Sequence, residues 1–169
     1  ERRRIQLGQL LLFEQLEQLN EGSFYELLQR FFELQGYREV EVSKDSETSG
    51  YNLLMWDEGK KIIVKCFKRV PMVKNLYTDA DGLDFALGEL VSLKEVREFY
   101  GCMKDFDVQA DIAIVLSTSD FSKEAMLFAA RNNMHLMNGH QFYHALHELK
   151  EEDLSENISY EMVLPEMTS

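Results

Sequence analysis

The stretch KIIVKCF, residues 61–67, places three consecutive branched aliphatic residues between lysines, a pattern typical of a strand inside a sheet. Two more strands are predicted before it, at residues 38–43, where valines alternate with glutamates, and at residues 51–56. Gly50 and the sequence Asp57-Glu58-Gly59 supply the turns between them. The middle of the chain is therefore expected to contribute three consecutive strands.

Segments with helical periodicity surround these strands. A helix is expected to begin at Ser23, whose hydroxyl can form a capping box with Glu26, and to end at Gly36. After the strands come a predicted loop at residues 68–90, helices at residues 93–106, 119–131 and 141–150, and strands at residues 111–117 and 135–137. The last two strands, joined by a helix, form a parallel crossover, so the sequence predicts an α/β sandwich.

The charge of the chain is strongly negative. Its 169 residues include 18 basic and 30 acidic side chains, which gives a net charge of −12. This charge excludes the broad positive surface that non-specific binding of nucleic acid requires. Residues 151–169 contain six acids and no Lys or Arg, and they are expected to form a flexible acidic tail.

The length of the chain allows one ordinary domain with short extensions. Leucines at helical spacing predict an amphipathic helix at residues 3–19, so residues 1–22 are expected to be an N-terminal helical extension ahead of a domain at residues 23–150. Two distant cysteines indicate neither a disulfide framework nor a zinc site, which favours a cytoplasmic setting. No apolar run could cross a membrane, although Arg2–Arg4 would suit the cytoplasmic edge of an anchor preceding Glu1.

Four stretches, in order, resemble the Mrr-type restriction endonuclease family, a branch of the PD-(D/E)xK nuclease superfamily. The segment from Phe24 to Tyr37 is similar to the opening helix of that family, and VREFYG at residues 96–101 to its "VRELYG". STSDFSKEA at residues 117–125 resembles "TTSGFTKEA", and LMNG at residues 136–139 resembles "LIDG". The resemblance implies a restriction-endonuclease-like αβββαβ sandwich with a mixed central sheet, here with an extra N-terminal helix.

The resemblance also implies where a nuclease centre would lie. The family places an Asp in a "GGIDV"-like stretch near the second strand and a Q/E-x-K pair in a "VQCKR"-like stretch of the third. The corresponding GYNL at residues 50–53 and VKCFK at residues 64–68 put Asn52 at the acid, Lys65 at the Gln/Glu and Phe67 at the Lys. Mg²⁺ needs hard oxygen ligands, which a cation and a phenyl ring cannot supply. We therefore expect a degenerate centre with no metal and no cofactor.

Other residues could still build a nuclease centre. Glu26 aligns with an acid on the first helix of the family that supports the metal site, although its place in a capping box favours a structural role. Asp45 and Glu47 precede Asn52 and could replace the missing carboxylate, with Lys65 or Lys68 as the basic group. An active Mg²⁺-dependent DNA endonuclease with migrated catalytic residues is therefore the alternative to an inactive domain.

A basic strip between residues 60 and 74 contains six cations and no acid. Its members are Lys60, Lys61, Lys65, Lys68, Arg69 and Lys74. The strip could bind DNA phosphates, or it could be a solvated strand end balanced by nearby acids. The net charge and the leucine-rich first helix instead favour a protein partner or self-association. The expected function is a catalytically inactive module that binds DNA or protein, with no small-molecule substrate.

Overall fold

The structure of the chain is a computed structural model that describes residues 12–71, 73–74 and 86–149; the side chains of residues 73–74 and 86–87 are not placed. The predicted acidic tail, and the part of the predicted first helix before residue 12, lie outside the described residues. In the described part of the chain, no helix is both long and apolar enough to cross a membrane.

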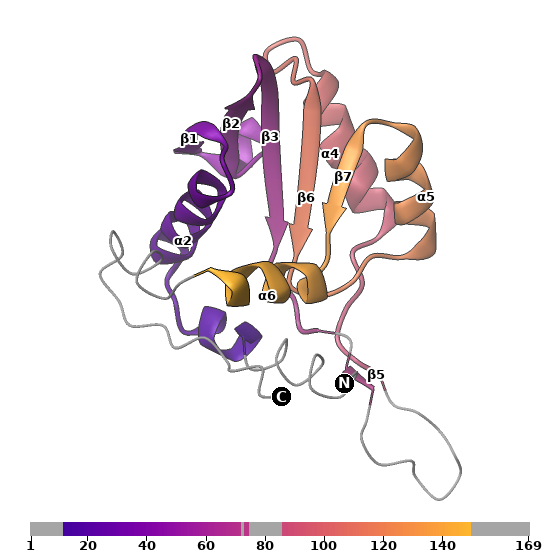
Figure 1. Cartoon of the computed structure of the whole chain (residues 1–169). Coiled ribbons are helices and arrows are strands. Elements are labelled where there is room, and N and C mark those ends of the chain that lie inside the picture. Colours follow the sequence, from indigo (N-terminus) through magenta and orange to yellow (C-terminus); the bar gives the residue numbers. More distant parts are fainter. Residues whose placement is uncertain (1–11, 72, 75–85, 150–169) are drawn as a thin grey trace, which may run out of the picture.

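A five-stranded mixed sheet forms the centre of the domain (Figure 1). Its order is β1 (Arg38–Val42), β2 (Leu53–Asp57), β3 (Lys60–Phe67), β6 (Ile112–Ser117) and β7 (Met134–Met137). The first three strands are antiparallel, whereas β3, β6 and β7 run parallel. The predicted αβββαβ sandwich is confirmed, with residues 61–67 in the middle strand of the sheet.

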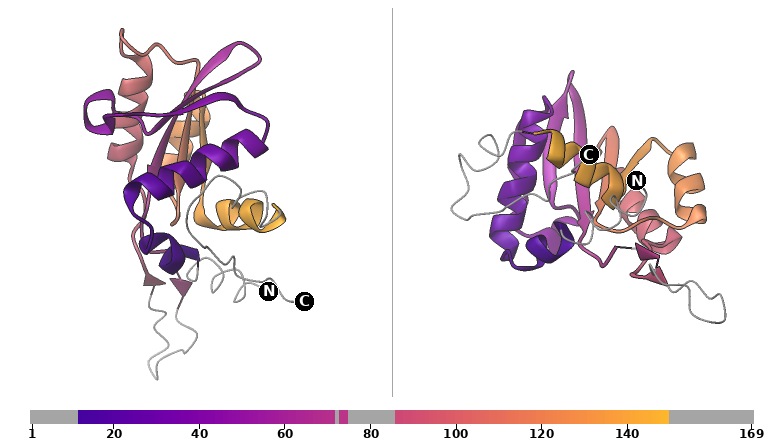
Figure 2. Two further views of the ribbon diagram at one scale, coloured as in Figure 1. Left: turned by 90° about the vertical axis from the view of Figure 1, so that its left-hand side faces the viewer. Right: turned by 60° about the horizontal axis from the view of Figure 1, so that its bottom comes forward.

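Helices cover both faces of the sheet (Figure 2). One face carries α2 (Glu21–Leu34) and α6 (Gly139–Glu148), and the other carries α4 (Leu93–Lys104) and α5 (Lys123–Arg131). A short helix, α3 (Ser46–Ser49), connects β1 to β2. The segment predicted as a loop, residues 68–90, contains a small two-stranded sheet of β4 (Val73–Lys74) and β5 (Ala86–Leu87), which is too short to show a periodic pattern.

The alternation of β3 creates two separate cores. Ile62, Val64 and Cys66 pack on the side of α2 and α6, while Ile63 and Phe67 pack on the side of α4 and α5. Successive side chains of a strand point to opposite faces, so this division follows directly from the sequence. We refer to the two sides as the α2 face and the α4 face.

The N-terminal segment differs from the expected extension. Residues 12–17 are helical, and Leu12 and Leu16, 2% and 0% exposed, belong to the core of the α2 face. The predicted capping box at Ser23 is wrong, because α2 begins earlier and Asn20 caps it by accepting a hydrogen bond from the Ser23 N–H (2.8 Å). The family-like domain therefore starts before residue 23 in its packing.

Candidate nuclease centre

Asn52 lies immediately before β2, where that strand meets β3. Leu53 pairs with Val64, so Asn52 and Lys65 are the next pair along the same register. The Asn52 backbone N–H donates to the Val64 carbonyl (2.8 Å), and Asn52 is only 3% exposed. The residue at the expected position of the metal-binding acid is thus buried between two strands.

Both ends of the Asn52 amide are used in hydrogen bonds within the protein. Its Oδ1 accepts from the Cys66 backbone N–H (2.8 Å), and its Nδ2 donates to the Tyr25 hydroxyl (3.1 Å). A single side chain therefore joins β2, β3 and α2. Buried polar groups require hydrogen-bond partners, and the two hydrogen bonds of Asn52 connect these three elements. We refer to this arrangement as the Asn52 structural joint.

The neighbours of Asn52 carry no negative charge at neutral pH. Burial, followed by the nearby charge of Glu21, raises the pKa of Tyr25 to about 12. Burial also raises the pKa of the Cys66 thiol to about 12, against the opposing effect of Lys68 and Lys65. The Tyr25 hydroxyl donates to Glu21 Oε1 (3.2 Å), which places this carboxylate beyond the tyrosine on exposed surface.

Lys68, just after the end of β3, lies on the α2 face, as the Asn52 amide does. Its Nζ donates to the Leu16 carbonyl (3.4 Å) and lies 5.2 Å from the centroid of the Phe24 ring. The sequence alignment assigned the lysine position to Phe67 instead. The structure places Lys68, not Phe67, on the same side of the sheet as Asn52.

Lys65 and Phe67 lie on the α4 face, apart from the Asn52 amide. They line a cavity of about 330 Å³, whose other lining residues are Ser46, Glu47, Gly50, Glu95, Glu98, Phe99 and Cys102. Residues directly opposite in an antiparallel pair normally share a face. Asn52 departs from this rule because it precedes β2, and the chain there turns its amide toward α2 while Tyr51 packs on the α4 face.

Sequence reasoning chose Glu26 on the first helix and missed Tyr25. Glu26 is exposed, whereas Tyr25 reaches Asn52. The signal was present in the helical periodicity, because Phe24, Leu27, Leu28 and Phe31 are the buried stripe of α2. At 100° per residue, position 26 faces away from that stripe and position 25 lies at its border.

The proposed substitutes for the missing acid do not gather around Asn52. Asp45 is the N-cap of α3, and its carboxylate accepts from the Thr48 hydroxyl (2.7 Å) and backbone N–H (3.3 Å), which lowers its pKa. Glu47 lines the cavity on the α4 face with Lys65. Among the residues that the structure describes, no group of three His, Cys, Asp or Glu side chains could hold a metal ion.

The basic strip is not one surface in the described structure. Lys60 and Lys68 lie eight residues apart, which corresponds to about 26 Å along an extended strand. Lys61 Nζ donates to the Val108 carbonyl (2.7 Å), and Arg69 forms a two-armed ion pair with Glu95. Lys65 lines the cavity of the α4 face, and the side chain of Lys74 lies outside the described residues.

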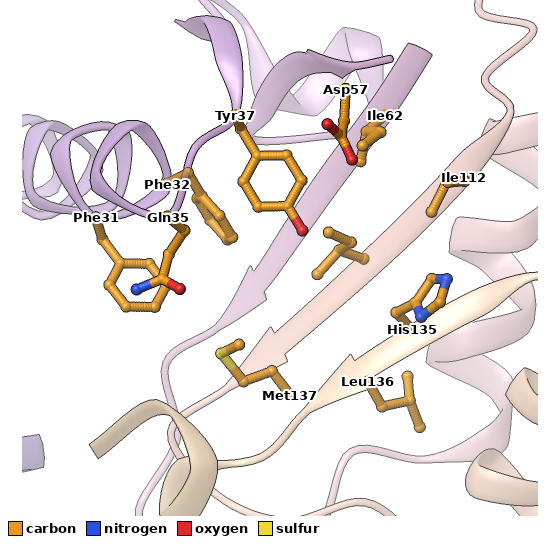
Figure 3. Close-up of a pocket in the computed structure, with 11 residues that line it drawn as sticks. Phe31, Phe32, Gln35, Tyr37, Asp57, Ile62, Ile112, His135, Leu136 and Met137 are labelled. Atoms are coloured by element: carbon orange, nitrogen blue, oxygen red, sulfur yellow. The ribbon is translucent and has the colours of Figure 1, made fainter. Parts of the chain in front are cut away.

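A second cavity, of about 320 Å³, lies on the open part of the α2 face (Figure 3). Its floor is apolar, formed by residues such as Phe32, Ile62 and Met137, and Asp57 and His135 are among its polar lining residues. Burial, followed by the charge of Asp57, raises the pKa of Tyr37 in its wall. This cavity contains none of the residues expected in the nuclease centre.

Comparison with known proteins identifies one family. A family model described as a restriction endonuclease, Mrr_cat, matches residues 16–146. A solved structure, that of the protein of unknown function AF1548, is similar at 15% sequence identity with a TM-score of 0.49. The alignment covers 70% of this chain and 58% of that one. No curated protein matches the chain.

Proposed function

Since this chain belongs to the Mrr-type restriction endonuclease family, we propose that it is a domain of nuclease fold that binds DNA without cleaving it. The proposal rests on two points: the domain keeps the fold of the family, and the positions expected to hold the catalytic residues carry Asn52, Lys65 and Phe67 instead. Fold and function are separable in this way, because activity depends on the side chains of the site.

The observation that carries the proposal is the pair of hydrogen bonds made by Asn52. Its only side-chain oxygen already accepts from the Cys66 N–H, and its nitrogen faces the Tyr25 hydroxyl. Mg²⁺ needs several oxygen ligands, at least one or two of them anionic, and it activates a water for attack on phosphorus. The donor set around Asn52 is a neutral amide, a protonated phenol, a protonated thiol and a lysine, so it does not fit this metal.

DNA is the ligand we favour, because it is the substrate implied by the family of restriction endonucleases. Lys68 follows the end of β3 on the side of the sheet that holds Asn52, whereas Arg69 is held in an ion pair with Glu95. A phosphate contact through Lys68 would position DNA without requiring catalysis. The strongly negative net charge predicts that binding is weak, and so few phosphate contacts predict a shallow dependence on salt.

A protein partner is the second candidate, and it is favoured by apolar side chains on the surface. Phe106 is 84% exposed just after α4, and Leu127 is 59% exposed on α5. Isolated exposed apolar residues are common on soluble proteins, so these two alone do not define an interface.

The proposal is tested by incubating the protein with supercoiled plasmid, methylated and unmethylated, in Mg²⁺ or Mn²⁺. Cleavage and retention of the plasmid are both measured over a series of salt concentrations. We expect retention at low salt, no cleavage, and no heat of Mg²⁺ binding by calorimetry. Metal-dependent cleavage that is abolished by Glu47→Ala would refute the inactive centre and support migrated catalytic residues.

Two triple variants test whether a metal-binding centre can be rebuilt on the α2 face or at the aligned positions. Tyr25→Glu, Asn52→Asp and Cys66→Glu together place three carboxylates on the α2 face, beside Lys68. The control set, Asn52→Asp, Lys65→Gln and Phe67→Lys, follows the sequence alignment. We expect Mn²⁺ to raise the melting temperature of the first set only, because ions that bind the folded state stabilise it. Stabilisation of the control alone would refute the assignment.

A further inference from the structure

The helical residues 12–17 lie next to the N-terminal end of α2 (Figure 2). Leu12 and Leu16 are buried in the same core cluster as Phe24, with Tyr25 and Cys66 packed against it. The family match begins at residue 16, within these helical residues. Residues 12–17 are therefore part of the packing beside Tyr25 and Cys66.

The C-terminal end of this helix is in contact with Lys68. The Leu16 carbonyl, which also accepts from the Leu19 N–H (3.1 Å), receives a hydrogen bond from Lys68 Nζ (3.4 Å). The last carbonyls of a helix carry partial negative charge and attract cations. Together with the face of Phe24, 5.2 Å away, this contact occupies the ammonium group that would otherwise meet a phosphate.

The docked position of the helix includes one unsatisfied polar group. Gln15 Oε1 is buried and has no hydrogen-bond partner among the described residues. A buried acceptor without a partner favours any state in which water reaches it. The packing of Leu12 and Leu16 therefore stabilises the helix in this position, although burying Gln15 Oε1 without a hydrogen bond costs free energy.

We propose that the helix at residues 12–17 is an internal cover over the DNA-binding face, and that its displacement frees Lys68 to contact a DNA phosphate. This inference rests on the proposed DNA-binding function and adds its regulation. An N-terminal element held by a few apolar side chains, Leu12, Phe13 and Leu16, is the kind of local unit that opens without unfolding of the whole domain. Opening would expose a cation at the edge of the former centre while leaving the Asn52 joint intact.

The test uses the full chain and the double variant Leu12→Ser/Leu16→Ser, which weakens the apolar contacts without changing charge. Gln18→Ser, an exposed neutral position, is the matched control. The first measurement is the rate at which an amine-specific acetylating reagent labels Lys68, relative to exposed Lys60, determined by mass spectrometry. We expect slow labelling of Lys68 in the unaltered chain and the control, and labelling close to that of Lys60 in the double variant.

The second measurement is retention of a short DNA duplex over a salt series. The double variant should bind more tightly than the unaltered chain, with a salt slope larger by about one unit, and Lys68→Ala in that background should remove the gain. Rapid labelling of Lys68 in the unaltered chain would overturn the cover, and this result does not depend on how the variant folds. Faster labelling in the double variant without any DNA retention would leave the cover established and refute the DNA-binding function.

Discussion

Replacing Asn52 with Ala should destabilise the domain strongly, because the side chain links three elements. The Cys66 N–H would lose its side-chain acceptor in the interior, which costs about 2 kcal/mol, and the hydrogen bond to Tyr25 contributes about 1 kcal/mol more. We therefore expect Asn52→Ala to lower the free energy of unfolding by about 3 kcal/mol. For a chain of this size the melting temperature should fall by about 6–12 °C.

Urea unfolding followed by circular dichroism measures this loss, and Tyr25→Phe provides the matched variant. Tyr25→Phe removes only one hydroxyl and should cost about 1 kcal/mol. The double variant should then cost about 1 kcal/mol less than the sum of the two, because both single changes remove the same hydrogen bond. A loss below about 1 kcal/mol for Asn52→Ala, or strict additivity with Tyr25→Phe, would refute the structural joint. Stabilisation by Asn52→Ala would instead indicate a residue kept for function.

Three further predictions concern pH, packing and charge. Burial raises the pKa of Cys66 from 9.0 to about 12, so the unfolded thiol loses its proton first and stability should fall as pH rises through this window. Cys66→Ala should flatten that decline in urea titrations between neutral pH and about pH 11. Gly139→Ala should cost about 2 kcal/mol, because its Cβ would lie 2.2 Å from the Thr118 backbone oxygen after β6, whereas Gly101→Ala, facing open space within α4, should gain about 0.5–1 kcal/mol; equal melting temperatures would contradict this difference in packing. The hydrogen bond from Arg69 lowers the pKa of Glu95, so Arg69→Ala should cost up to about 1 kcal/mol at neutral pH. That difference should vanish as pH falls through the lowered pKa of Glu95, and a constant difference would exclude the ion pair as its cause.

The strands were predictable because their patterns are local. KIIVKCF lies at β3 with its alternate residues divided between two cores, and the crossover segments form β6, α5 and β7. Branched aliphatic residues favour the extended backbone of a strand, and alternate side chains point to opposite faces of the sheet. The strands can therefore be located without tertiary information. The start of α2 was predicted at the wrong residue because Ser23 and Asn20 both suit a cap, and in the structure the Asn20 side chain accepts the hydrogen bond from the Ser23 N–H.

The residue types at the aligned positions could be identified from the sequence, but the side chains that surround Asn52 could not. The sequence shows that the stretch around Asn52 and the end of β3 lack carboxylates at the aligned positions. It could not show that Asn52 turns toward α2 just before β2, which selects Tyr25, Cys66 and Lys68 as its neighbours in place of Lys65 and Phe67.

The α/β architecture and the central place of residues 61–67 follow from the amino-acid sequence alone, since they depend on residue type and short-range periodicity. The folded chain was needed to show which side of the sheet Asn52, Lys65 and Phe67 occupy, and that Leu16 packs beside Tyr25 and meets Lys68. A strand's register and a helix's rotation are set by burial against partners distant in the chain. A displacement of one residue moves a side chain to the opposite face.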